Sequence, residues 1–265
     1  MKTKIVGILN VSLDSFSDGG QYFAPQNAII KGKDLKEAGA HIIDIGAESS
    51  HPDSAKISVE EEIKRLAPVI QALKKDHLYI SVDTYKPEVM EYVLNLGVNM
   101  INDITALSNP LSIEILNRYD APIVLMYARN IDPKANKSVW ESDQPTDVIL
   151  SFFEKRLEHL VREGIKKERL ILDPGMGFFL GSNPEPSLKV LKEINRFKQL
   201  GQKLYVSTSR KSFIGSILGR TINERGIGTL ATEIWAVLQG VDYVRTHDVK
   251  PLNDALRMIQ AIEEA

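Results

Sequence analysis

Eight short runs rich in Val and Ile recur along the chain, and a longer amphipathic stretch follows each of them. The runs have the length of β-strands, and their nearly continuous apolar character fits strands buried on both faces, as in a parallel sheet. Eight strands that alternate with helices predict a (β/α)8 TIM barrel, with its active site at the carboxyl ends of the strands. The runs are Lys4–Asn10, His41–Glu48, Tyr79–Thr84, Met100–Thr105, Pro122–Tyr127, Leu170–Gly175, Lys203–Ser209 and Tyr243–Asp248.

Local signals support this alternation. The stretch Ser58–Lys74 has apolar residues at helical spacing, and Ser58 with Glu61 has the spacing of a capping box. Prolines stand where the first turn of a helix would begin, and glycines stand where helices should end, a few residues before a strand. The prolines are Pro87, Pro110 and Pro251, and the glycines are Gly39, Gly97, Gly164, Gly201 and Gly240.

The length fits one such barrel. The chain has 265 residues, and a TIM barrel typically has roughly 250. No linker, low-complexity tract or repeat divides the sequence, so we expect residues 1–265 to form a single domain. A doubly wound open sheet is the alternative, but it usually has about five to seven strands and often a Gly-rich first turn. The segment Gly7–Asn10 has no such pattern.

Composition excludes several classes of function. The chain has 33 Lys and Arg against 35 Asp and Glu, which argues against a nucleic-acid partner because such proteins concentrate positive charge. The absence of cysteine excludes disulfides, thiolate metal sites and Cys nucleophiles. No apolar run approaches the ~18 residues of a membrane span, and the first residues lack the features of a signal peptide. We therefore expect a cytoplasmic protein with no membrane partner.

Polar residues close nearly every predicted strand. A buried strand has little reason to carry them, except at its carboxyl end in a barrel enzyme. Asp83, Asn102 and Asp173 would bring acceptors and amide donors together at one mouth of the barrel. Such a set suits the edge of a polar heteroaromatic ring, because buried polar groups need matched partners.

Basic residues follow the last two strands, where barrels frequently bind phosphate. Lys211, Arg245 and His247 would form a cationic group there. Asn10 could give a neutral oxygen to Mg²⁺, which completes its shell with water and phosphate oxygens. The substrate class is therefore a planar heterocycle that carries a phosphate or pyrophosphate. Displacement of pyrophosphate needs charge stabilisation rather than a covalent nucleophile, and the sequence shows no clear nucleophile–base pair.

Each of these residues also has a purely structural interpretation. Asn10 and Asn102 could cap helices, and Asp173 before a Pro-Gly pair could form only a turn. Lys211 and Arg245 could belong to structural ion pairs, and a lone histidine is more often a loop residue than a ligand. Their joint placement at one end of six strands favours a functional site.

Several ordered motifs resemble those of the dihydropteroate synthases, in the pterin-binding barrel family, and the match runs almost the whole length of the chain. Motifs of this length and order are far more specific than a lone glycine pattern. They are Gly7–Val11, Asp14–Gly20, Asp44–Ser50, Ser81–Pro87, Ile101–Asp103, Ile171–Phe178, Ser209–Gly215 and Arg245–Asp248.

The resemblance implies a reaction of folate biosynthesis. In that family p-aminobenzoate displaces pyrophosphate from 6-hydroxymethyl-7,8-dihydropterin diphosphate, by a dissociative route, and gives 7,8-dihydropteroate. The family also implies Mg²⁺ as the cofactor and a homodimer formed through the late helices. Two loops, around Ser12–Gly20 and Ser49–Asp53, would close over the site.

The resemblance assigns roles to residues that match the family's motifs. Asn10, Lys211, Arg245 and His247 would be catalytic. The full sets are Asp83, Asn102, Met126, Asp173 and Lys211 for the pterin ring; Asn10, Arg245, Thr246 and His247 for the diphosphate, with Mg²⁺ at Asn10; and Ser49, Ser50, His51, Pro52, Phe178, Lys211 and Ser212 for the p-aminobenzoate pocket.

Two alternatives share the pterin-binding fold. Methyltetrahydrofolate:corrinoid methyltransferases would keep the Asp/Asn/Asp set but have no need of a cationic diphosphate site. Lys211, Arg245 and His247 together favour the synthase. A barrel that binds pterin but has lost catalysis is the second alternative, because some loop residues depart from the family's pattern.

These departures fall mostly in loops. Ser12-Leu13 stands for the usual Thr-Pro, His51 replaces an arginine, and Asp53 replaces a glycine. Tyr127 stands for a frequent histidine and Ser207 for a frequent glycine. The loss of a permanent cation and of backbone freedom changes the p-aminobenzoate loops but removes no residue assigned to the pterin ring. The sequence DPGMGFFLG, at residues 173–181, also resembles sulfonamide-insensitive versions of the enzyme.

We therefore predict that the core reaction is retained while recognition of p-aminobenzoate, or of the sulfonamides that mimic it, is altered. The measurement is the sulfonamide inhibition constant beside the KM for p-aminobenzoate. Ordinary values of both would contradict this prediction.

Overall fold

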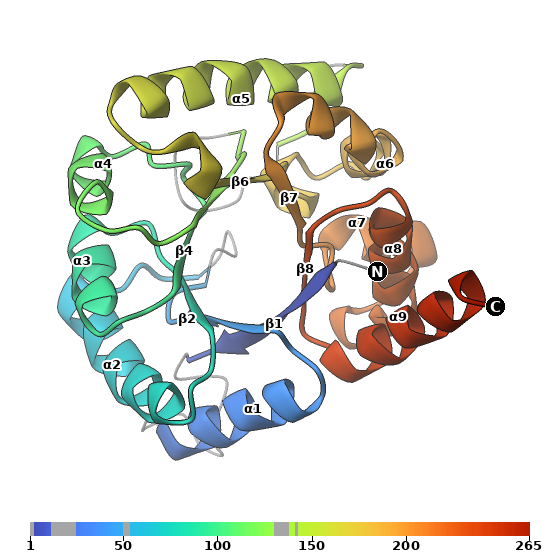
Figure 1. The fold of residues 1–265 in the computed structure, drawn as a ribbon. Helices are drawn as coiled ribbons and strands as arrows, with labels where there is room; N and C mark the ends of the chain where they lie inside the picture. Colours follow the sequence, from blue (N-terminus) through green and yellow to red (C-terminus); the bar gives the residue numbers. More distant parts are fainter. Residues whose placement is uncertain (1–2, 12–24, 50–53, 130–137, 141–142) are drawn as a thin grey trace.

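The structure, a computed structural model, describes residues 3–11, 25–49, 54–129, 138–140 and 143–265. Its strands form a closed parallel barrel in the order β1 to β8, and helices surround the barrel (Figure 1). The predicted (β/α)8 fold is confirmed. The strands are β1 Lys4–Asn10, β2 Ile42–Gly46, β3 Ile80–Asp83, β4 Met100–Asp103, β5 Ile123–Met126, β6 Leu170–Asp173, β7 Lys203–Val206 and β8 Tyr243–Thr246.

The helices of the described residues fill the intervals between the strands. Short 3-10 turns at Lys167–Arg169, Gly177–Phe179, Ile194–Leu200 and Ile222–Glu224 complete the connections. Within the described ranges, no helix is both long and apolar enough to span a bilayer. The α-helices are α1 Pro25–Glu37, α2 Val59–Lys75, α3 Pro87–Asn95, α4 Pro110–Leu116, α5 Pro145–Arg162, α6 Glu185–Lys192, α7 Ser212–Leu218, α8 Gly226–Leu238 and α9 Val249–Glu263.

The predicted helix boundaries follow the local chemistry. Ser58 caps α2, where its hydroxyl accepts the N–H of Glu61 at 3.2 Å, while the Glu61 carboxylate pairs with Arg65. Pro87 and Pro110 are the first residues of α3 and α4, and Pro251 lies in the first turn of α9. Each of the five predicted glycines has a positive φ, from 76° to 109°, as a chain leaving a helix requires.

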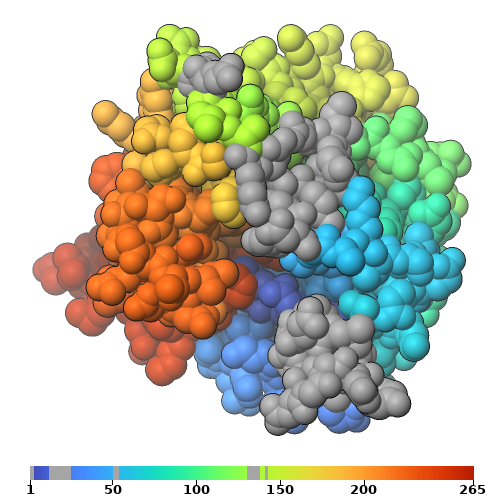
Figure 2. Space-filling model, turned by 180° about the vertical axis from the view of Figure 1, so that it is seen from behind, coloured from blue at the N-terminus to red at the C-terminus, as the bar shows by residue number. Residues whose placement is uncertain are grey.

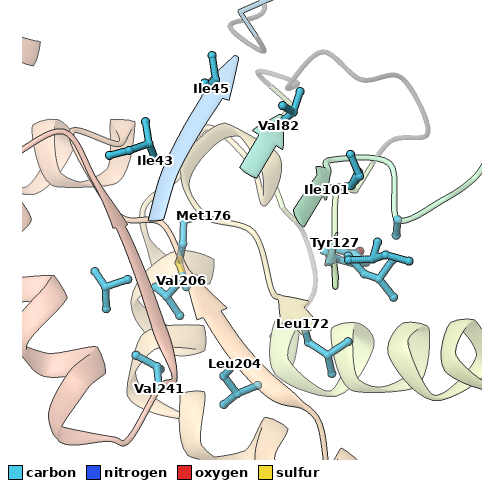
Figure 3. Close-up of a cluster of buried hydrophobic side chains, with 14 of the residues drawn as sticks. Ile43, Ile45, Val82, Ile101, Tyr127, Leu172, Met176, Leu204, Val206 and Val241 are labelled. Atoms are coloured by element: carbon cyan, nitrogen blue, oxygen red, sulfur yellow. The ribbon is translucent and has the colours of Figure 1, made fainter. Parts of the chain in front are cut away.

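Alternation along the strands divides the core into two layers. Ile43, Ile45 and Val82 belong to the large cluster between the barrel and its helices, part of which Figure 3 shows. The neighbours of these residues point the other way. A second cluster fills the barrel interior and consists of Val6, Ile42, Met100, Val124, Ile171, Tyr205 and Tyr243.

This alternation also decides which polar residues point into the barrel. Asp44 lies two residues after the interior Ile42, and Asn102 two after the interior Met100. Asp173 and Arg245 follow Ile171 and Tyr243 in the same way. Because parallel barrel strands run in the same direction, these side chains gather above the interior layer at one mouth. Seen from the side opposite to Figure 1, segments from both halves of the sequence meet around one centre (Figure 2).

Two helix-ending glycines allow the fold to be tested. A Cβ on Gly39, at φ 109°, would overlap the side chain of Asn253, whereas Gly201, at φ 76°, has nothing within 4 Å of that position. We expect Gly201→Ala to lower the free energy of unfolding by ~1–2 kcal/mol, the cost of a left-handed L-residue. Gly39→Ala should lower it further. Urea unfolding of both variants measures this, and equal losses would show that the Asn253 contact is unimportant.

Candidate active site

The register of the strands brings the predicted site residues side by side. Asp83 pairs in register with Asn102 across β3 and β4. Met126 pairs in the same way with Asp173 across β5 and β6. Asp83 and Asn102 therefore lie on adjoining strands, and β5 separates them from Asp173 on β6.

Arg245 connects these groups across the barrel. Its Nε donates to Oδ2 of Asp44 at 2.6 Å, and its NH2 group donates to Oδ2 of Asp83 at 2.9 Å. The amide of Asn102 donates to the same oxygen of Asp44 at 3.0 Å. Asp44 is fully buried, so its charge needs these partners. A guanidinium from β8 thus joins carboxylates on β2 and β3.

Burial changes the protonation of the carboxylates. It raises the pKa of Asp83 to about 7, against the opposing charge of Arg245 and with the help of the negative charge of Asp44. It also raises the pKa of Asp173 to about 6, although the N–H of Gly175 and the charge of Lys211 favour the ionised form. Both carboxyl groups therefore titrate near neutral pH, where an incoming N–H or ring nitrogen can select either form.

Asp173 forms the turn that the sequence allowed as its structural role. Its Oδ1 accepts the N–H of Gly175 at 2.9 Å and so forms the turn after β6. Gly175 has φ 71°, and a Cβ there would overlap the carbonyl oxygen of Tyr127. The turn needs glycine, and it leaves the second carboxylate oxygen of Asp173 for a ligand.

Lys211 stands over an aromatic ring. Its Nζ lies 4.7 Å from the centre of the Phe179 ring, a geometry in which the ring face attracts the cation. Burial lowers the pKa of Lys211 to about 8, helped by the charge of Arg245. Phe178, which was expected near Lys211, precedes Phe179 in the chain and is half-buried. Ser212, which follows Lys211, begins α7.

The surroundings of His247 do not favour the charged form that the sequence predicted for it. Burial, with the positive charge of Arg245, lowers its pKa to about 3, so its imidazole is neutral near pH 7. Its Nδ1 lies 2.9 Å from the hydroxyl of Ser209. A neutral imidazole that accepts this hydroxyl at Nδ1 carries its proton on Nε2, where it can donate to an anion.

Thr246 turns its side chain toward α8 rather than toward the mouth. Its side chain is fully buried, its Oγ1 accepts the N–H of Asp248 at 3.1 Å, and its hydroxyl interacts with Glu233 of α8. The side chain therefore points away from the mouth, because Thr246 follows the interior Arg245 by one residue. Only its backbone remains for the predicted diphosphate contact.

Asn10 is the exposed last residue of β1 and pairs in register with Gly46. Among the described residues, no three His, Asp or Glu side chains converge in a way that would hold a metal ion. A lone amide oxygen fits a Mg²⁺ that takes most of its ligands from water and a bound diphosphate, rather than a metal held by protein alone.

Part of the predicted p-aminobenzoate pocket lies outside the described residues, namely Ser50, His51 and Pro52, as does the Ser12–Gly20 loop. Ser49 is exposed at the end of β2. The chain returns at residue 54 over a buried ion group in which Lys86 donates to Glu48 at 2.7 Å and to Glu62 at 2.6 Å. The N–H of Ile57 also donates to Glu48 at 3.2 Å, so residues on either side of the undescribed segment 50–53 meet at this group.

Two further points concern Tyr127 and the residues to which the sequence assigned no role. Tyr127, which stands for a frequent histidine, packs edge-on against Phe152 and Trp140, so it belongs to the core. The residues without a predicted role are Asp44, Ser209 and Glu233. Asp44 lies in a predicted strand and in a family motif, and its role could have been assigned because an acidic residue on the inward face of a buried strand needs a buried partner.

The family model described as "Pterin binding enzyme" matches residues 6–247. The chain is 45% identical over 261 residues to "Dihydropteroate synthase type-3" of Escherichia coli, covering 98% of this chain and 99% of that protein. It is similar to the solved Xanthomonas albilineans dihydropteroate synthase with 4-aminobenzoic acid, with a TM-score of 0.91 at 35% identity over 100% of this chain and 94% of that one.

A second X. albilineans structure, in complex with 7,8-dihydropteroate, has a TM-score of 0.87 at 33% identity and covers 100% of this chain and 95% of that one. The chain therefore belongs to the pterin binding enzyme family, as its motifs predicted.

The coupling of Asp44 to Asp83 can be tested directly. Asp44→Asn removes a negative charge that raises the pKa of Asp83, so we expect that pKa to fall below about 7. Carboxyl ¹³C NMR titration measures it, and Asp76→Asn, in a surface pair with Lys33, is the control. An unchanged Asp83 titration would mean that the two carboxylates do not interact.

Proposed function

We propose that the chain is a dihydropteroate synthase of folate biosynthesis. It would condense p-aminobenzoate with 6-hydroxymethyl-7,8-dihydropterin diphosphate, to give 7,8-dihydropteroate and pyrophosphate. The relatives named above carry the name dihydropteroate synthase, and two solved neighbours hold 4-aminobenzoic acid or 7,8-dihydropteroate. The cytoplasm is the location we predict for it.

The position of Arg245 is the observation that carries the proposal. It donates to Asp83 of the Asp83–Asn102 pair, which suits a ring with N–H and carbonyl groups. It also lies close enough to Lys211 and His247 for its charge to lower the pKa of each. A pterin has such a ring edge, and its diphosphate needs cations and donors. One mouth thus offers both kinds of contact at once.

We infer that Asp83, Asn102 and Asp173 hold the pterin ring. A ring N–H that reaches Asp173 would favour the ionised carboxylate, and burial has already brought its pKa to about 6. Met126 lies beside Asp173 in register and offers an apolar contact to the flat ring. Lys211, over Phe179, would contact both the ring and the p-aminobenzoate side of the site.

The displacement itself needs little from a nucleophile on the protein. The C–O bond from the pterin methylene to the diphosphate breaks and its electron pair leaves on pyrophosphate. The amine nitrogen of p-aminobenzoate then bonds to that carbon and loses a proton. A dissociative path places positive charge on the methylene and negative charge on the leaving group. Arg245, Lys211 and a neutral His247 that donates from Nε2 would stabilise the latter.

Mg²⁺, when bound, would neutralise part of the charge of the diphosphate. Asn10 would hold it together with water and diphosphate oxygens. This requires only the exposed position of Asn10 at the end of β1, and the residue's role in catalysis would be to place the metal-bound diphosphate beside Arg245.

Altered recognition of sulfonamides belongs to the same proposal. Lys211, Ser212 and Phe178 would form the fixed wall of the p-aminobenzoate pocket, with Ser49 and the residues after it on the other side. The buried group of Glu48, Lys86 and Glu62 lies next to Ser49 in the chain and would hold the start of that side in place.

A homodimer through the late helices is also proposed. Apolar side chains lie exposed on these helices, and a partner that covers them would remove apolar surface from water. They are Ile217 and Leu218 on α7, Ile222 and Ile227 before and on α8, Trp235 and Leu238 on α8, and Met258 and Ile262 on α9.

We expect pyrophosphate release from the pterin diphosphate with Mg²⁺ only when p-aminobenzoate is present. Arg245→Gln should lower kcat/KM by about 100-fold or more, the typical effect of losing a group that stabilises developing charge. Arg118→Gln, in an exposed pair with Glu91, should not change it.

Two other results would favour the alternatives to a synthase. Pterin binding without pyrophosphate release would reject the synthase and favour a barrel that only binds pterin. Methyl transfer from methyltetrahydrofolate to a corrinoid protein would favour the methyltransferase alternative.

A further inference from the structure

A buried acid on α8 lies outside the groups that the reaction uses. Glu233 is almost fully buried, and its Oε1 has no hydrogen-bond partner among the described residues. The carboxyl group interacts with the hydroxyl of Thr246 on β8. Burial of an acid in this way destabilises the folded protein unless its hydrogen bonds compensate for the lost hydration.

Thr246 connects Glu233 to the backbone that carries His247. The Thr246 oxygen already accepts the N–H of Asp248 at 3.1 Å, so its own proton can go to the Glu233 carboxyl. On the other side, the N–H of His247 donates to Ser209 at 3.1 Å. Two hydrogen bonds thus fix the peptide groups before and after the His247 Cα, and Glu233 supports one of them.

The surroundings of Glu233 keep it neutral. Burial raises its pKa to about 8, the negative charge of Asp248 adds to this, and the Thr246 hydroxyl opposes it. Asp248 comes from the start of α9 and pairs with Arg210, from the turn after β7, at 2.9 Å. The other neighbours are uncharged: Thr229 and Leu230 of α8 and Pro251 of α9, which line a hollow of about 210 Å³ beside Glu233.

We propose that Glu233 is a positioning residue: through the Thr246 hydroxyl it holds the backbone of His247 and Asp248 in the orientation that binds the diphosphate. That the ligand is a diphosphate rests on the proposed function, whereas the effect of Glu233 on the backbone does not. Ionisation of Glu233 at alkaline pH would set its charge against that of Asp248 and loosen the same segment.

Three variants separate positioning from packing. Glu233→Ala removes the acceptor for Thr246, and Glu233→Gln keeps an acceptor but cannot ionise. Val237→Ala, on the same helix and also buried, removes apolar packing but no hydrogen-bonding group. Each is measured by hydrogen exchange at the Asp248 amide and by the KM for each substrate, over a range of pH.

We expect Glu233→Ala to lose about tenfold in protection at the Asp248 amide and to raise the KM for the pterin diphosphate by about tenfold, as for one lost buried hydrogen bond. The KM for p-aminobenzoate should stay within about twofold. Glu233→Gln should restore both values at pH 7 and should lack the loss of protection that the unmodified protein shows above pH 8.

Unchanged Asp248 protection in Glu233→Ala would overturn the proposal. So would an equal rise in the diphosphate KM with Val237→Ala, because that would reflect general loss of packing. If the unmodified protein releases no pyrophosphate, the proposed function fails, and the exchange measurement still decides the positioning role.

Discussion

The site depends on one buried ion group, in which Arg245 is held between Asp44 and Asp83. A guanidinium inside a barrel is costly unless nearby carboxylates compensate for its lost hydration. The three residues come from β8, β2 and β3, on either side of β1, so their contact requires the closed barrel and its register. A shift of one residue in any of these strands would turn the side chain to the outer face. The ion group and the register therefore support each other.

Much of the fold could be predicted from the strand-like runs and from the prolines and glycines that mark the ends of helices. Lys4–Asn10 has the predicted bounds, and seven strands have ends that the sequence placed up to three residues too late. Most of the excess residues are polar or small, as in Ser207 to Ser209, and they lie beyond the last residue of their strand. Single-residue alternation predicts that Asp173 and Arg245 point inward. It also predicts that Thr246 points outward, although the resemblance to a family assigned it to the site.

Contacts within the site could not be predicted in the same way. Arg245 and Asp44 are 201 residues apart in the chain. The sequence around either residue does not predict that the two are in contact. The charge of His247 depends on burial and on the field of Arg245, neither of which a motif contains. Phe178 and Phe179 are adjacent and chemically alike, so only the conformation of a short 3-10 turn decides which ring lies under Lys211.

The charges at the mouth of the barrel are paired with one another, which shapes how an anion can bind. Arg245 is engaged by two carboxylates, and Lys211 lies close enough to Asp173 and Asp83 for their charges to raise its pKa. An anion that binds to these cations must therefore share them with the protein's own carboxylates. Asp83, with a pKa near 7, can take up a proton as the anion arrives, whereas Asp44 keeps Arg245 in place. A ligand that carries N–H donors beside its anion would compensate these carboxylates for the cations that the anion takes from them.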